Sequence, residues 1–174
     1  MSARMDLLGE GPCSALACPV RTRTASGAAG PLESYSKAAG LAEQAEGWAL
    51  ACHAWFGAGG AHLLRENHGP AAVAYREAER AARCAEIAPL RIEALRMAGA
   101  CLLRAGDESD AMRAWREAVD LGAELGASEL LPSTFAEVAE SLAALLERRG
   151  LQPQAQHVRA LAALGQVTAA TPVT

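Results

Sequence analysis

The chain has little of several features that mark other protein classes. Among its 174 residues there is one lysine, aromatic residues make up 4%, and acidic residues outnumber basic ones, for a net charge of −4. The sequence therefore lacks the basic footprint of a protein that binds nucleic acid or anionic lipid. No run approaches the ~20 apolar residues of a membrane span. We expect neither nucleic acid nor a membrane as a partner.

Signatures of catalysis and metal binding are missing as well. The sequence has no glycine-rich phosphate loop, no HExxH and no GxSxG motif. Its five cysteines are irregularly spaced, which is typical of reduced, mostly buried thiols and not of a disulfide framework. Cys13 and Cys18 form a lone C-x4-C pair, for which two free thiols are favoured over a metal site. We predict no enzyme activity, no cofactor and no metal.

Two histidines are candidates for catalytic or metal-binding groups. Cys52 and His53 are neighbours in a predicted helix, so their side chains point about 100° apart and do not face each other. His62 stands at a packing position and is interpreted as a core or boundary histidine with satisfied polar atoms. Neither histidine forms zinc-type spacing with Cys52 or Cys101.

The first twenty residues contain Asp6 and Glu10 and lack the apolar region of a secretory signal. We therefore expect a cytoplasmic protein. The excess of arginine over lysine, with many alanines and glycines, is typical of a GC-rich bacterial coding sequence.

What the chain does contain is an internal repeat. Half of its residues are apolar, mainly alanine and leucine, which are strong helix formers, so an all-α fold is expected. Between Trp55 and Leu121 the sequence matches itself at a shift of forty positions, a period typical of stacked repeats. The matched positions are Trp55 with Leu95, Gly59 with Gly99, Ala71 with Ala111, Tyr75 with Trp115, and Ala78 with Ala118. Tyr35 and Ala38 continue the series toward the N-terminus.

Apolar periodicity, turn residues and prolines predict seven helices. Gly57, Gly59 and Gly60 lie inside the second, where close helix–helix approach is the favoured reason and a kink the competing one. The predicted helices are Pro31–Glu46, Trp48–Glu66, Ala71–Ile87, Leu90–Ala105, Ala111–Leu125, Thr134–Arg149 and Pro153–Leu164. Asn67–Pro70 is predicted as a turn, and Glu108–Asp110 as the source of capping oxygens.

A helical hairpin repeated at forty residues buries its faces only by stacking on its neighbours. We therefore predict a short right-handed α-solenoid of about seven helices in antiparallel hairpins. It spans residues 31–164, with a flexible N-terminal tail at 1–30 and a flexible C-terminal tail at 165–174.

The repeat resembles the tetratricopeptide repeat. Leu95-x3-Gly99-x2-Leu102 followed by Ala111-x3-Trp115-x2-Ala118 fills the family's pattern of bulky, small and aromatic positions. The preceding unit fills all but one, with His62 in place of the usual aromatic residue. The period is forty instead of the family's usual 34 or so, and the closing proline is absent, so the helices are longer.

The resemblance implies a scaffold, adaptor or chaperone that binds a peptide or helix of another protein on its concave face. The family's groove positions correspond here to two sets of residues, one from each of two first helices. The candidate partner-binding residues are His53, Phe56, Leu63, Leu64, Glu93, Arg96, Leu103 and Arg104. They suit an amphipathic segment with an apolar anchor and an acidic group.

The sequence leaves open one alternative for the groove and one for the function. Phe56, Leu63 and Leu64 are equally consistent with packing against the N-terminal helices, which would leave no groove. A structural subunit that self-associates through the edge of its repeat is the second functional hypothesis.

Overall fold

Helices make up all of the regular structure in the computed structural model, which describes residues 30–126 and 132–169; there is no strand in those ranges. This confirms the all-α prediction. The seven helices of the described ranges are α1 (Pro31–Gln44), α2 (Trp48–Leu63), α3 (His68–Cys84), α4 (Ala88–Arg104), α5 (Glu108–Glu124), α7 (Pro132–Arg148) and α8 (Gln152–Ala169). None of these helices has the length and apolar character needed to cross a membrane.

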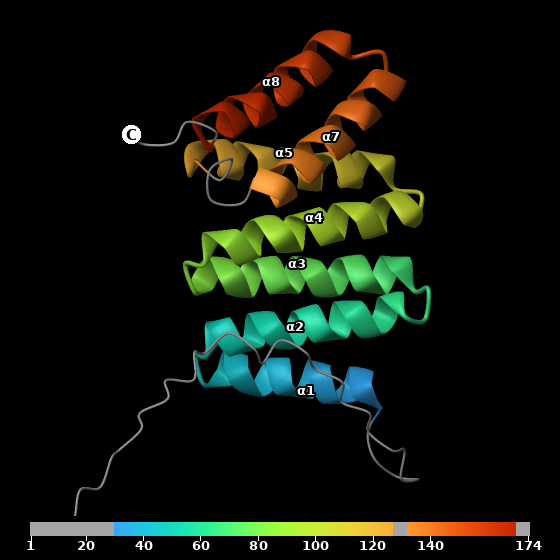
Figure 1. Ribbon diagram of the computed structural model, residues 1–174. Coiled ribbons are helices and arrows are strands. Elements are labelled where there is room, and N and C mark those ends of the chain that lie inside the picture. The colour runs from blue at the N-terminus through green and yellow to red at the C-terminus, as the bar shows by residue number, and fades with distance from the viewer. Residues whose placement is uncertain (1–29, 127–131, 170–174) are drawn as a thin grey trace, which may run out of the picture.

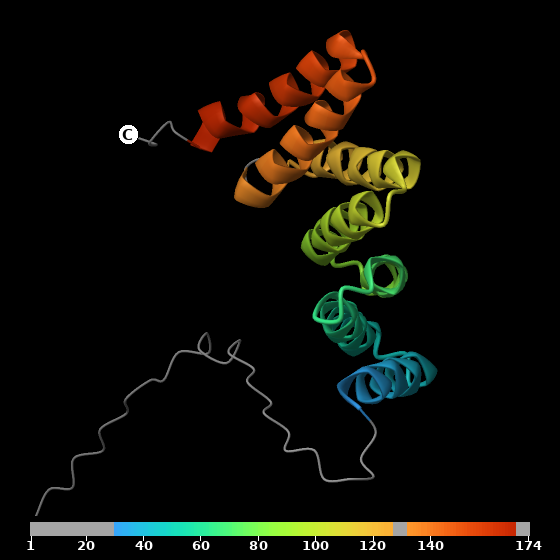
Figure 2. The ribbon, with the colours of Figure 1, turned by 90° about the vertical axis from the view of Figure 1, so that its right-hand side faces the viewer.

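The helices form a solenoid-like stack in which each reverses the direction of the one before (Figure 1). Consecutive helices pack against each other, and α7 also contacts α4. Seen from the side, α2 and α4 form one layer, and α1, α3 and α5 form the other (Figure 2). The α7–α8 hairpin leans toward the side of α2 and α4, so the stack bends around that layer (Figure 2).

The turns between helices share one backbone geometry. After α2, the N–H of Asn67 donates to the carbonyl of His62 at 3.0 Å, and that of Glu66 donates to Leu63 at 2.9 Å. Glu66 is left-handed, with φ 59°. This is a Schellman motif, which satisfies carbonyls at the end of a helix. Left-handed residues follow the other helices at Glu46, Glu86, Gly106, Gly126 and Gly150. From Glu46 to Gly126 they recur every twenty residues, so a helix and its turn form the unit and a hairpin makes the period of forty.

Several predicted boundaries are wrong by three residues or more: α2 ends at Leu63 and not at Glu66, α3 ends at Cys84 and not at Ile87, and α5 begins at Glu108 and not at Ala111. α3 begins at His68, so Gly69 and Pro70 lie in its first turn, where proline's missing N–H costs nothing. α8 continues past Leu164 to Ala169, because no proline interrupts it before Pro172. The C-terminal tail predicted to begin at residue 165 is therefore helical up to 169. Residues 170–174 and the predicted tail up to residue 29 lie outside the described residues.

The N-terminus of α5 also differs in detail from the prediction. The cap is Asp107, whose Oδ1 accepts a hydrogen bond from the N–H of Asp110 at 3.1 Å. Glu108 and Asp110 lie in the first turn, where their negative charge interacts favourably with the helix dipole. They therefore contribute charge, and the capping oxygen comes from the residue before them.

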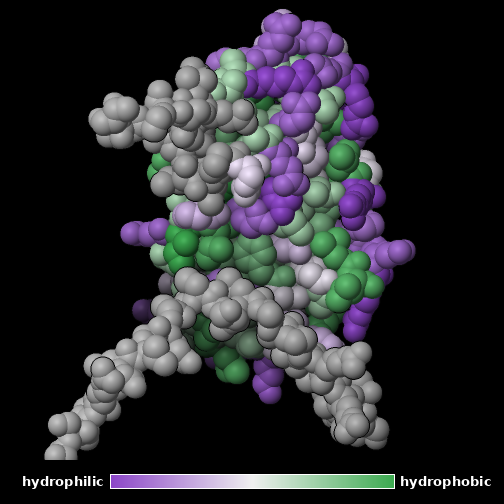
Figure 3. Space-filling view, viewed as in Figure 1, coloured by the Kyte–Doolittle hydropathy of each residue, from purple (hydrophilic) through white to green (hydrophobic). Residues whose placement is uncertain are grey.

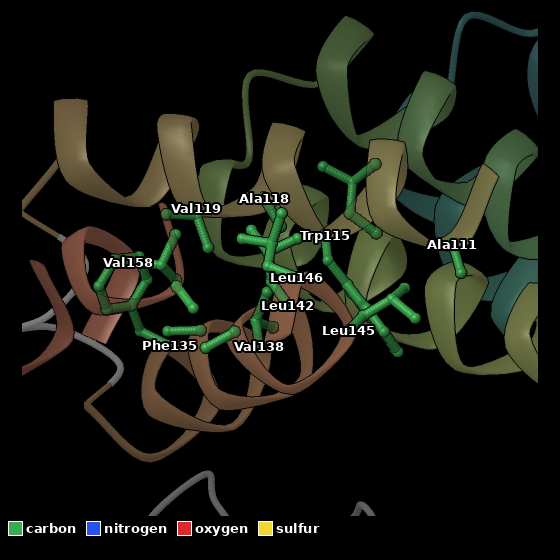
Figure 4. Packing of buried hydrophobic residues seen from close by; sticks show 14 of the residues in the cluster. Ala111, Trp115, Ala118, Val119, Phe135, Val138, Leu142, Leu145, Leu146 and Val158 are labelled. Atoms are coloured by element: carbon green, nitrogen blue, oxygen red, sulfur yellow. The ribbon is translucent and has the colours of Figure 1, made fainter. Parts of the chain in front are cut away.

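The larger apolar side chains are concentrated in the C-terminal half of the stack. Phe135, Leu142, Leu145 and Leu146 of α7 are buried against Trp115 and its neighbours on α5 (Figure 4). The N-terminal half is filled mainly by alanine. Its buried cluster contains Ala42, Ala51, Cys52, Ala78, Ala81, Ala82 and Ala94. Small side chains bring the helices of this half close together.

Two glycines of the forty-residue period lie beneath aromatic rings. A Cβ added at Gly59 would lie 2.7 Å from Cζ of Tyr75, and one added at Gly99 would lie 2.3 Å from Nε1 of Trp115. Both rings are buried. Close helix approach is thus the reason for these glycines, as expected for Gly59. Gly60 has nothing within 4 Å of an added Cβ, so the packing reason expected for it is wrong.

Tyr35, the third aromatic residue of the series, lies in a different environment. Its ring rests on Gly57 of α2, the helix that follows α1, where an added Cβ would lie 2.5 Å from Cε1. It remains 36% exposed, against 3% for Tyr75 and 4% for Trp115. The difference arises because no helix of the described part precedes α1.

Candidate partner-binding face

The eight candidate residues lie on or next to α2 and α4, the neighbouring helices of one layer (Figure 2). His53 and Phe56 lie near the middle of α2, and the matched Glu93 and Arg96 lie near the middle of α4. At the other ends of these helices, Leu63 and Leu64 match Leu103 and Arg104. On the part of this surface that is visible in Figure 3, hydrophobic and hydrophilic side chains lie next to each other.

The apolar candidates differ in how much of each is already packed. Phe56 is half-buried and meets the ring of Tyr75 edge-on, with centroids 5.6 Å apart and an interplanar angle of 66°. Leu63 is half-buried against a cluster of α3 and α4 residues, and Leu103 against the C-terminal core. Leu64 is 90% exposed. Phe56 and Leu63 thus have much of their packing on α3 and α4, and Leu64 is free to contact a partner.

Arg96 is fully engaged by carboxylates of its own chain. Its Nε and Nη2 donate to both oxygens of Glu93, at 2.9 and 2.6 Å, and its Nη1 donates to Glu137 of α7 at 2.8 Å. The hydrogen bond with Glu93 raises the pKa of the guanidinium, and burial opposes this in part. Arg96 therefore has no free edge for an acidic group of a partner, which removes one support for the acidic partner expected from the sequence.

A second arginine is also held by carboxylates of its own chain. Arg159 of α8 donates to both oxygens of Glu140, each bond 2.8–2.9 Å long, and also to Glu147. The hydrogen bonds with Arg159 lower the pKa of both carboxyls. Each arginine is thus shared by two glutamates, and each triad carries a net charge of −1.

The carboxylates of these triads reach the surface on α7. Glu137 and Glu140 lie three residues apart, and their side chains are 62% and 61% exposed. Residues three apart on a helix are neighbours on its surface. The layer of α2, α4 and α7 therefore ends in a pair of exposed acidic groups beside α8.

Sequence reasoning missed three ion pairs that connect alternate helices, one of which joins Arg80 of α3 to Glu43 of α1 at 2.8 Å and a separation of 37 residues. Arg96 pairs with Glu137 across α4 and α7, and Arg76 pairs with Glu117 across α3 and α5 at 2.9 Å. In each of the latter two pairs the residues are 41 positions apart. A search of the sequence for opposite charges 41 positions apart, one more than the repeat period, would have found these two pairs.

Cys52 and His53 do not form an activated pair. His53 is exposed and Cys52 is buried, and burial raises the pKa of the Cys52 thiol to about 11, the opposite of the change that activates a nucleophile. Cys101 is buried as well and Cys84 is exposed, so two of the three described thiols are buried, in agreement with the expectation of mostly buried thiols. Cys13 and Cys18 lie outside the described residues. Within those residues, no group of three or more His, Cys, Asp or Glu side chains is placed to hold a metal ion.

His62 lines a hollow of about 510 Å³ between the first three helices. Ser36 of α1, Trp55 of α2 and Val73 of α3 are also part of its lining. The His62 ring is half-buried, and its Nδ1 is buried without a hydrogen-bond partner within the described part of the chain. His62 is thus a boundary residue, as interpreted from the sequence, but the expectation that its polar atoms are all satisfied is wrong for Nδ1 within the described residues.

In the comparisons with known proteins, no family model matches the chain and no curated protein matches its sequence. Its function is therefore argued from its own residues.

Proposed function

We propose that the chain is a cytoplasmic, non-catalytic adaptor or chaperone similar to tetratricopeptide-repeat proteins. It binds a peptide or helix of another protein on the layer formed by α2, α4 and α7. One observation carries this proposal: the matched helices α2 and α4 lie in one layer, and the stack bends around it (Figure 2). A stack that bends around one layer is typical of repeat proteins that use a concave surface for binding.

The partner segment combines an apolar anchor with a basic group. Leu64 is 90% exposed and lies beside the half-buried Leu63, so an apolar side chain of the partner can pack on it. Glu137 and Glu140 favour a basic group on the partner. Each lies in a cluster of two glutamates and one arginine, which leaves one negative charge uncompensated. Complementary charge on a partner accelerates encounter and fixes its orientation more than it adds affinity.

The test uses a library of helical peptides that vary in apolar and basic positions, with binding measured by fluorescence anisotropy. Leu64→Glu changes an exposed side chain and should weaken binding of the selected peptides by about tenfold or more, as a lost apolar contact of roughly 1.5–3 kcal/mol implies. Val73→Glu is the matched control, because Val73 is also an exposed aliphatic residue, 64% accessible, but lies on α3 in the other layer.

The basic group is tested with the double variant Glu137→Gln and Glu140→Gln. It should slow association of basic peptides and reduce the salt dependence of binding, with little effect on neutral ones. Equal losses for Leu64→Glu and Val73→Glu would refute the assignment of the face. Selection of acidic peptides by the library would refute the assignment of the partner's charge.

A further inference from the structure

The first helix of the stack exposes a face that its counterpart buries. Residues of α1 on this face are small or apolar, as are the residues forty positions later in α3. The exposed residues of α1 are Pro31, Ser34, Tyr35, Ala38 and Leu41. The buried counterparts in α3 are Ala71, Ala74, Tyr75, Ala78 and Ala81. The composition of the α1 face is therefore that of a packed surface.

Within the described residues, no helix precedes α1 to cover this face. α3 is covered by α2 and α5 by α4, whereas α1 stands at the end of the described stack (Figure 2). The forty-residue register assigns residues 8–23 to the position that α2 holds for α3. Pro12 and Pro19 fall inside that span, and Pro19 stands at the slot of Gly59 and Gly99. Proline inside a helix removes a backbone hydrogen bond and clashes with the preceding turn, so this stretch is a poor match to α2.

The opposite end of the stack has a different surface. The exposed positions in the first half of α8 are mostly polar: Gln152, Gln154, Gln156 and His157. A polar outer face is what a terminal repeat needs for solubility. Contact of α8 from one copy with α1 of another would place glutamines against the apolar face of α1. Pairing of two α1 helices avoids this mismatch.

We propose that α1 forms the interface of a twofold-symmetric homodimer, in which the α1 helices of two copies pack antiparallel. With the axis near Ser36, Ser34 of one copy meets Ala38 of the other, and Pro31 meets Leu41. The small residues at the centre allow close approach of the two helices. A twofold interface requires such a self-complementary surface.

The charges beside this face are self-complementary as well. Glu33 and Lys37, the only lysine of the chain, are both exposed, and they lie one turn apart along the same edge of α1. In an antiparallel pair the two edges meet, so each Lys37 lies near the Glu33 of the other copy. The two edges therefore attract each other instead of repelling.

Sedimentation equilibrium of the full chain tests the proposal. The interface is a single helix of 14 residues, small beside the standard of about 800 Å² per partner, so a weak dimer is expected. The apparent mass should rise with concentration from 18.0 kDa toward twice that value. Ala38→Arg should raise the dimer dissociation constant at least about tenfold. Gln156→Arg on α8, also an exposed position, should leave it unchanged.

Three outcomes would overturn the proposal. One is a monomer at all concentrations. Another is a dimer that Gln156→Arg disrupts and Ala38→Arg does not. The third is protection of the α1 amides from hydrogen exchange equal to that of the α3 amides at concentrations where the chain is monomeric, because the chain's own residues would then cover the face. Protection of α1 that increases with concentration, and is lost in Ala38→Arg, supports the dimer.

Discussion

Alanine at Gly99 would place its methyl carbon 2.3 Å from Nε1 of Trp115 and 2.5 Å from Cδ1. Real Cβ atoms do not approach a ring so closely, and the ring is only 4% exposed, so it has little room to retreat. Trp115 also donates from Nε1 to the carbonyl of Arg96 at 3.2 Å, and a shifted ring would lose this bond. The substitution therefore has two opposing effects on stability. It disrupts the packing of α5 on α4, and it improves the helix propensity of α4.

The relative sizes of these free-energy contributions decide whether Gly99→Ala stabilises or destabilises the protein. Alanine in place of glycine inside a helix stabilises by about 1 kcal/mol. Overpacking costs about 1–3 kcal/mol, and loss of the hydrogen bond costs about 1 kcal/mol. Gly99→Ala should therefore lower the free energy of unfolding by about 1–3 kcal/mol. Gly60→Ala is the control inside α2, where an added Cβ meets nothing within 4 Å, and it should stabilise the protein by about 0.5–1 kcal/mol.

Urea unfolding followed by circular dichroism measures both effects without relying on tryptophan fluorescence, which the substitution itself would change. Each kcal/mol corresponds to a melting shift of about 2–4 °C for a chain of this size. Trp115→Leu should cost less in the Gly99→Ala background than in the original chain, because the pair is coupled. If Gly99→Ala stabilises as much as Gly60→Ala, the ring does not lie on Gly99 and the packing argument fails.

Two further results are expected. Glu66 has a left-handed backbone with φ 59°, so Glu66→Gly removes strain and should stabilise the protein by about 1 kcal/mol. Gly106→Ala, at φ 89°, should destabilise the protein by a similar amount. Shifts of the melting temperature with the same sign for both variants would contradict the turn geometry. Alkylation of the native protein at mildly alkaline pH, mapped by mass spectrometry, should label Cys84 and spare Cys52 and Cys101, because burial raises the pKa of both thiols; equal labelling of Cys52 and Cys84 would show that α2 is not packed as described.

The sequence predicted most of the fold because its signals are local or periodic. The glycine inside the predicted second helix indicated close helix approach at Gly59, and the structure shows that the ring of Tyr75 is what approaches. The order and type of the helices follow from the same pattern. The stop of α8 could not be located because Gly165 does not end a helix by itself, and the nearest strong breaker is Pro172.

The twenty-residue unit was hidden by the residues that form the turns. Glu46, Glu66 and Glu86 adopt the left-handed conformation that glycine adopts at Gly106 and Gly126. Glutamate has no preference for this conformation and pays about 1–2 kcal/mol to adopt it. A search for glycine at helix ends therefore finds only part of the series, whereas the left-handed backbone angles show all of it.

The candidate face was predicted less completely, because its electrostatics depend on pairs between helices. Spacing of three residues indicates the Arg96–Glu93 pair, which the structure has at 2.6 Å. Nothing in that local rule indicates Glu137, which takes the remaining edge of Arg96. The sequence suggested an acidic group on the partner because Arg96 and Arg104 were both expected to be free. Arg96 is occupied by its own chain's glutamates, and only Arg104 remains exposed.

Matched slots of α2 and α4 differ in polarity in a consistent direction. Phe56 corresponds to Arg96, and Leu64 corresponds to Arg104, so the layer changes from apolar to charged along the stack. The next helix of the layer, α7, adds exposed carboxylates and no exposed aliphatic anchor comparable to Leu64 among its described residues. A bound segment that crosses the layer would therefore place its apolar end on α2 and its basic end on α7. The reverse orientation would bring a basic group to Leu64 and leave the surplus carboxylates uncompensated.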